Sequence, residues 1–97
     1  MDALIRQAIA EKKLVEFQYQ GYTRIAEPHV YGRNGGVEQL LVYQVRGGSK
    51  SGRLPNWRRV DLLEVSGLHI LNETFPGRRA SPSGGHSSWD ETFAIVS

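Results

Sequence analysis

Cysteine is absent from this chain of 97 residues, so the sequence allows neither a disulfide framework, nor a thiolate zinc site, nor a cysteine nucleophile. Long apolar runs are also lacking: the longest ones, such as residues 40–43, are far too short to span a bilayer. The N-terminus carries Asp2 where a signal peptide would carry basic residues. These absences predict a cytoplasmic protein that does not contact a membrane.

A strong excess of charge of one sign is missing as well, because the formal net charge is only +2. A net charge this small is weak evidence for binding to nucleic acid. Most of the 12 basic residues are nevertheless arginines, and arginine is suited to bidentate contact with phosphate and to stacking on bases. The composition therefore permits a phosphate-bearing ligand without requiring one.

The length leaves little room for a second hydrophobic core, so one domain is expected. Apolar residues make up 39% of the chain and charged residues 23%, as in globular proteins, while 11 glycines and 4 prolines indicate frequent turns. The spacing of Leu4, Ile5, Ala8 and Ile9 behind Asp2 predicts a helix that runs to about residue 12.

Strands are expected after this helix, because apolar and polar side chains alternate from Val15 onward. Pro28 lies inside one such segment and favours a bend or an edge position there. Asn34-Gly35-Gly36 predicts a tight turn before the most apolar strand of the chain. The predicted strands cover residues 15–20, 23–31, 37–45, 57–65 and 68–71.

Five short strands behind one helix predict a mostly β fold: a small, Sm-like or SH3-like, five-stranded and strongly bent antiparallel barrel with the helix over one open end. Residues 1–76 form this domain, which includes a polar, glycine-rich loop at 47–56 of the kind that often carries function. Residues 77–88 are expected to be a flexible linker. Residues 89–97 form an aromatic tail, helical or extended, that docks on the domain or on a neighbouring copy.

Several motifs, in this order along the chain, resemble those of the WYL domain family. They are a helix at residues 4–9, a strand that ends in Phe17-Gln18-Tyr19, the segment Arg24-Ile25-Ala26-Glu27-Pro28, a core strand that ends at Tyr43, and Ile70-Leu71-Asn72-Glu73-Thr74-Phe75. The resemblance covers roughly residues 4–75, and the Arg-x-x-Glu-Pro element is its most specific portion. Short free-standing relatives look similar at residues 27–32, 43–49 and 57–59.

The tripeptide Trp-Tyr-Leu of the family would fall at residues 38–40, where only Leu40 remains. The resemblance implies an Sm-like barrel of about five strands that senses a ligand, commonly nucleotide-like or single-stranded nucleic acid, and controls an effector. No helix-turn-helix precedes the domain in this chain, so the resemblance implies that the effector is a separate protein.

The residues themselves indicate where such a ligand would bind. Arginines on different strands can converge on a phosphate, and flat side chains can stack on bases. The alternatives are that the arginines pair with Glu27, Glu38 or Asp61 as surface ions, and that the aromatic and histidine side chains are structural. The predicted ligand-binding or nucleic-acid-binding residues are Arg24, His29, Tyr31, Tyr43, Arg46, Trp57, Arg58 and Arg59.

Catalysis and metal binding have little support in the sequence. No serine lies in a strand-turn-helix elbow, and no isolated pair of carboxylates suits acid-base chemistry, so no catalytic residue is predicted. His29, His69 and His86 lack the spacing of metal ligands, and neither a metal nor a cofactor is expected.

The leading hypothesis is a regulatory, ligand-sensing domain that binds a nucleotide or single-stranded nucleic acid and is not an enzyme. The alternative is a protein-interaction or self-assembly module, in which Trp89 and Phe93 of the aromatic tail make a homo-oligomer.

Overall fold

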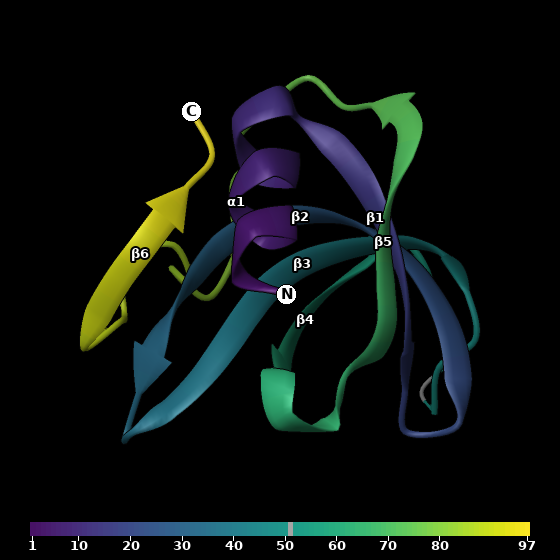
Figure 1. The fold of residues 1–97 in the computed structure, drawn as a ribbon, viewed down its shortest axis with the longest axis horizontal. Helices are drawn as coiled ribbons and strands as arrows, with labels where there is room; N and C mark the ends of the chain where they lie inside the picture. The colour runs from purple at the N-terminus through teal and green to yellow at the C-terminus, as the bar shows by residue number, and fades with distance from the viewer. Residues whose placement is uncertain (51) are drawn as a thin grey trace.

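The computed structural model describes residues 1–50 and 52–97, so Ser51, in the middle of the predicted loop, lies outside the described residues. The chain folds into a globule of about 29 × 27 × 26 Å. Its first element is the helix α1 (Asp2–Glu11). In the described residues, six strands follow: β1 (Lys13–Tyr19), β2 (Tyr22–Asn34), β3 (Val37–Gly47), β4 (Asn56–Asp61), β5 (Ser66–Thr74) and β6 (Glu91–Ile95), with a short 3-10 helix η1 (Leu62–Glu64) after β4 (Figure 1).

The strands form one antiparallel sheet in the order β4-β3-β2-β1-β5, and β6 pairs with β2. The sheet bends strongly around the core, but β4 and β5 stand at its two ends and do not pair with each other, so the barrel is not closed. The predicted mostly β fold, with bent antiparallel strands behind one N-terminal helix, is therefore confirmed. Every described helix is too short and too polar to cross a membrane.

Pro28 explains how β2 serves two different neighbours. The pairing of β2 with β1 ends at Ala26, and the pairing with β6 begins at Val30. A proline has no backbone N–H to donate, so it fits between these two ladders. The register of β2 against β3 also shifts between Pro28 and Val30. The predicted bend is thus present, inside the sheet rather than at its edge.

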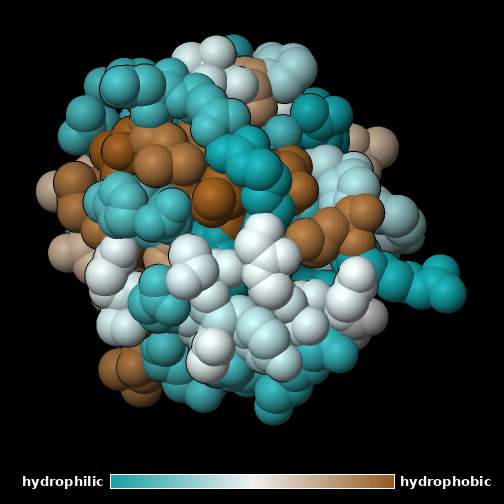
Figure 2. All heavy atoms as spheres, turned by 90° about the vertical axis from the view of Figure 1, so that its right-hand side faces the viewer, coloured by the Kyte–Doolittle hydropathy of each residue, from teal (hydrophilic) through white to brown (hydrophobic). Residues whose placement is uncertain are grey.

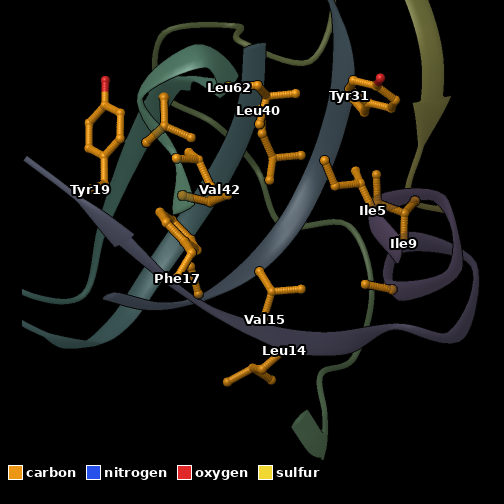
Figure 3. Close-up of a cluster of buried hydrophobic side chains, with 14 of the residues drawn as sticks. Ile5, Ile9, Leu14, Val15, Phe17, Tyr19, Tyr31, Leu40, Val42 and Leu62 are labelled. Atoms are coloured by element: carbon orange, nitrogen blue, oxygen red, sulfur yellow. The ribbon is translucent and has the colours of Figure 1, made fainter. Parts of the chain in front are cut away.

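The core fills the inside of the bent sheet, and α1 covers one end of it. Ile5 and Ile9 of α1 lie at one end of the core, while Tyr19 of β1 lies at the other (Figure 3). Between them, Phe17, Val42 and other side chains on the inner faces of the strands are buried. Asp2 makes no capping hydrogen bond at the start of α1 and instead pairs with Arg6 at 2.8 Å.

The aromatic tail is a strand, so of the two predicted conformations the helical one is wrong. The backbone of β2 beyond Pro28 is open on one side, and β6 pairs there from Val30 to Arg33 (Figure 1). Phe93 of β6 stacks edge-on against Tyr31 at a centroid distance of 4.9 Å. The tail thus gains both backbone pairing and aromatic burial on its own chain.

The segment of residues 77–88, the strap, contains no helix or strand and packs on the outer face of β2, β3 and β4. Arg79 binds Glu27 of β2 with both its Nε and its Nη2 atom, at 2.7 and 2.9 Å. Gly85 is buried against Leu41 of β3. The flexibility expected for this segment stays a prediction, but these contacts show where its side chains lie.

The replacement Gly32→Ala should detach β6 from β2. A Cβ atom at Gly32 would overlap the backbone oxygen of Glu91 and would lie 2.7 Å from Cε3 of the Trp89 ring. Overpacking of this kind costs about 1 to 3 kcal/mol of stability. Hydrogen exchange should show the amides of β6 losing protection, while those of β1 and β5 keep theirs. Unchanged protection of the β6 amides would contradict the claim that close packing at Gly32 is needed for the pairing of β6 with β2.

Candidate functional site

A polar pocket of about 260 Å³ opens at the end of the barrel opposite α1, and it is called the mouth below. The turn between β1 and β2 and the loop after β3 meet around this end, at the lower right of Figure 1. On the face of the molecule that contains them, residues of intermediate and hydrophilic character fill most of the lower half, whereas strongly apolar residues gather mainly in a band above it (Figure 2). The residues that line the mouth are Tyr19, Gln20, Arg24, Ser49, Lys50, Arg58, Arg59 and Val60.

Arg24 forms the charged floor of the mouth, and only 3% of its surface is exposed. Its Nε donates to the backbone oxygen of Tyr19 at 3.2 Å, and its Nη1 donates to Oε1 of Gln44 at 3.3 Å. Its guanidinium also lies 5.1 Å from the ring centre of Tyr19 and 5.7 Å from that of Tyr22. Across residues 1–50 and 52–97, no carboxylate forms an ion pair with Arg24, so every fixed partner of this buried cation is neutral.

Gln44 of β3 holds this arrangement in place. Its side chain is fully buried, in phase with Leu40 and Val42 on the inner face of the strand. While Oε1 accepts from Arg24, Nε2 donates to the backbone oxygens of Arg46 and Gly48 at 3.0 and 2.9 Å. One amide therefore fixes both the floor of the mouth and the start of the loop at its rim.

Arg58 and Lys50 add positive charge to the walls. Arg58 alternates with Trp57 and Arg59 along β4, so it shares the inward side of buried Val60. Its Nη2 donates to Oγ of Ser49 at 3.1 Å. Burial and the nearby charge of Arg58, in that order, lower the pKa of Arg24. Two guanidinium groups thus repel each other across a pocket whose described lining contains no carboxylate.

The other two predicted arginines direct their charges elsewhere. Arg59 borders the mouth, but its guanidinium lies 4.1 Å from the Trp89 ring centre, and it donates to backbone oxygens of Gly85 and Ser88. Arg46 is exposed and forms a bidentate pair with Glu73 of β5, in which Nη1 and Oε2 are 2.9 Å apart. The structure therefore brings Arg24 and Arg58 together, adds Lys50, and leaves Arg46 outside.

The alternative in which Arg24 pairs with Glu27 is wrong. The two residues are three apart on β2 and lie on opposite faces of the strand, so Arg24 points into the barrel and Glu27 outward under the strap. Glu38 pairs instead with Arg33 at 3.6 Å, and Asp61 accepts from Gln39 at 2.7 Å.

Glu27 belongs to a second polar group, here called the outer cluster, made of Glu27, His29, Trp57, Arg79 and His86. His29 is fully buried, with Nε2 3.4 Å from Oε1 of Glu27 and Nδ1 3.2 Å from Nε2 of His86. Because the carboxylate can only accept, Nε2 of His29 carries the proton and Nδ1 accepts from His86. Burial is the main cause that lowers the pKa of His29, to about 4.

The aromatic residues predicted to bind bases lie away from the mouth. Trp57 packs edge-on against His29 at a centroid distance of 4.7 Å, and the guanidinium of Arg79 covers Tyr43 at 5.1 Å. Tyr31 lies at the α1 end of the core, where its hydroxyl is within 3.0 Å of Asp2 and 2.9 Å of Glu38. The aromatic residue that is both exposed and close to Arg24 is Tyr22.

Sequence reasoning missed Gln44, Lys50 and Tyr22. The signal for Gln44 was present, because it is a polar residue at an inward position of an otherwise apolar strand. Lys50 lies in a loop with no periodic pattern that would place it. Tyr22 follows a glycine turn, which interrupts the alternation of inward and outward side chains along β1. The direction of the Tyr22 side chain therefore cannot be predicted from that alternation.

Comparison of the chain with protein-family models, with curated proteins and with solved structures found no match. The chemistry of the mouth has to be derived from its own residues.

Acid should destabilise the fold through His29. Its pKa is about 4 in the folded chain against an ordinary value of 6.5, so between these pH values the unfolded chain binds a proton that the folded chain does not. The free energy of unfolding should therefore fall as the pH decreases from about 6.5 to about 4, by up to roughly 3 kcal/mol. His86, whose pKa is lowered by burial and by Arg78, acts in the same direction.

Denaturant unfolding near neutral pH and near pH 4 measures this loss. In His29→Gln the loss should be much smaller, because no buried imidazole remains to exclude the proton. His69 is exposed on β5, so His69→Gln serves as the control and should lose as much stability as the unaltered chain. An equal loss in His29→Gln would show that another group causes the pH dependence.

Proposed function

We propose that this domain binds a nucleotide or single-stranded nucleic acid, and that it does so by holding phosphate in the mouth. The observation that carries the proposal is the buried Arg24, which faces a concave pocket and whose fixed partners among residues 1–50 and 52–97 are neutral. A buried charge is costly unless an opposite charge approaches it. An anion in the mouth would supply that charge to Arg24 and would also screen its repulsion with Arg58.

Phosphate suits this pocket because its oxygens can accept hydrogen bonds from several directions. Arg24, Lys50 and Arg58 reach the mouth from β2, from the loop after β3 and from β4, and guanidinium groups bind phosphate oxygens with strong, charge-assisted hydrogen bonds. Tyr22 offers a flat, exposed ring beside the floor of the mouth, on which a base could stack. Phosphate with a neighbouring base is the combination that a nucleotide provides.

The resemblance to WYL domains supports the same ligand class, and membership of that family is part of the proposal. Its Arg-x-x-Glu-Pro element contains Arg24, the floor of the mouth, and Pro28, where β2 changes partners. A cytoplasmic location and a regulatory role with a separate effector protein belong to the proposal too. No catalytic step is proposed.

Binding of a labelled single-stranded oligonucleotide, followed by fluorescence anisotropy across a salt series, tests the proposal. The affinity should fall linearly with salt on a log-log plot, with a slope of about 0.7 for each phosphate contact on a single strand. Lys50→Gln removes one exposed charge from the rim and should lower that slope by about 0.7. Arg24→Gln should weaken binding about tenfold or more, since it removes a charge-assisted contact at the floor.

The matched control is Arg46→Gln, because Arg46 is an exposed arginine of the same sheet that pairs with Glu73 outside the mouth. Its affinity and slope should stay close to those of the unaltered chain. Circular dichroism should confirm that each variant is folded. No binding of any oligonucleotide or mononucleotide at low salt would refute the proposal.

A second candidate, self-association, rests on an apolar groove of about 400 Å³ at the α1 end. Leu63 of η1 is 93% exposed at this groove, next to Met1 and Val37. Trp89 and Phe93, to which the alternative hypothesis gave this role, pack on their own chain in this structure. If no phosphate-bearing ligand binds, and light scattering shows an association that Leu63→Asp abolishes, this candidate replaces the first.

A further inference from the structure

We infer that the mouth selects a terminal phosphate, that is, a phosphomonoester on a mononucleotide or at a strand end, over the phosphodiesters inside a strand. The inference rests on the proposed function and specifies which part of the ligand enters the pocket. Three observations support it: the depth at which Arg24 lies, the size and closed floor of the pocket, and the balance of charge on its walls.

The depth of Arg24 requires a group that can enter the barrel. Only 3% of the residue is exposed, and its side chain is held from two sides by Tyr19 and Gln44, so its guanidinium cannot swing out to meet a ligand on the surface. The ligand has to bring its phosphate to the floor. A phosphate at the end of a molecule projects far enough, because only one ester oxygen carries a substituent.

The pocket is too small for a whole nucleotide. Its volume of about 260 Å³ lies below the range of about 300–1,000 Å³ that is typical of sites for drug-sized ligands. Tyr19 and Val60 line the pocket and belong to the hydrophobic core, so the core lies behind the pocket and a strand cannot pass through. An internal phosphodiester would need room for two flanking sugars and for the chain to enter and leave by the same opening. A terminal phosphate needs room for one sugar at most.

Gly48 and Tyr22 form one side of the opening. Gly48 lies so close to Tyr22 that a Cβ atom there would overlap the ring, and its N–H donates to the backbone oxygen of Thr23 at 3.0 Å. The loop after β3 is thereby pinned against β2 at one side of the opening. The exposed ring of Tyr22 remains outside the pocket, where the base attached to the inserted phosphate would lie.

The charge on the walls matches a monoester better than a diester. Arg24, Lys50 and Arg58 supply three positive charges, and none of the described residues that line the pocket is a carboxylate. A phosphomonoester carries about 1.5 to 2 negative charges near neutral pH and has three free acceptor oxygens, whereas a phosphodiester carries one charge and has two such oxygens. The second charge and the third oxygen give the monoester its advantage at this site.

The test uses the full chain and one oligonucleotide sequence with an internal fluorophore in four forms: 5′-phosphorylated, 3′-phosphorylated, with hydroxyl groups at both ends, and circularised. Anisotropy at one moderate salt concentration should show at least one phosphorylated linear form binding about tenfold or more tightly than the hydroxyl and circular forms. The form that binds best tells which strand end is recognised. Competition by adenosine monophosphate, compared with adenosine, tells whether a free mononucleotide suffices.

Variants of residues in the mouth test whether the preference for a terminal phosphate arises there. Arg24→Gln should reduce the ratio of affinities for phosphorylated and hydroxyl ends to near one, and Lys50→Gln, which alters only an exposed side chain, should reduce it severalfold. Arg46→Gln should leave the ratio unchanged. If Arg24→Gln does not fold, the Lys50→Gln result decides.

The outcomes separate this inference from the function on which it rests. Equal, salt-dependent binding of all four forms would overturn the selection of terminal phosphate and leave the proposed function standing. No binding of any form, nor of adenosine monophosphate, would overturn both. A preference for phosphorylated ends that survives in Lys50→Gln and in folded Arg24→Gln would place recognition outside the mouth, and it would also overturn the inference.

Discussion

Arg24 carries its positive charge into the bent sheet, where its partners, in the part of the chain that the structure describes, are neutral oxygens and the faces of two tyrosine rings. Burying an ion is among the costliest steps in folding, and the usual remedy is an opposite charge at hydrogen-bonding distance. Here the cation–π contacts and the two neutral acceptors compensate in part, and the pocket above the guanidinium is where an anion could complete the set. Gln44 and the backbone of Tyr19 hold Arg24 in this position, and Arg58 and Lys50 add to the positive charge of the mouth.

The fold creates this position through a few local rules of strand structure. Alternation along β2 sends Arg24 inward with Ala26, and alternation along β3 sends Gln44, the register partner of Ala26, inward as well, where its side chain accepts from Arg24. Pro28 lets β2 exchange β1 for β6 a few residues later, so that β6 and α1 cover the far end of the core while the mouth stays open. The outer cluster under the strap uses the opposite solution, because there the buried Glu27 does have its counter-ion, Arg79. Of these two buried charges on β2, Glu27 is paired with an opposite charge, whereas Arg24 in the mouth has neutral partners in the described structure.

The sequence predicted the helix and the presence of the first five strands, because those elements are set by local periodicity and by glycine turns. Two strand bounds were wrong: the strand predicted at 57–65 ends at Asp61, where η1 follows, and the one predicted at 68–71 extends over Ser66–Thr74. The sequence left the conformation of the tail open, since Trp89, Phe93 and Val96 are spaced for one helical face while residues 92–96 are also β-prone. Pairing with the free edge of β2 selects the strand. The sequence could identify Arg24 and Arg58 as candidate ligand-binding residues. Once the buried residues of a strand are known, alternation shows which of the other side chains point inward. It could not place His86 beside His29, a contact across 57 residues that depends on how the strap crosses the sheet. It also gave neighbouring Arg58 and Arg59 one role, although adjacent residues of a strand point to opposite faces.

The central claim is that the guanidinium of Arg24 meets an anion in the mouth, and side-chain NMR can observe that guanidinium directly. The Nε–Hε resonances of the arginines should be followed while adenosine monophosphate is added at constant ionic strength. The account predicts that the signals of Arg24 and Arg58 move together and saturate, while that of Arg46 stays in place because its partner is Glu73. A titration in which Arg24 does not move, or moves no more than Arg46, would contradict it.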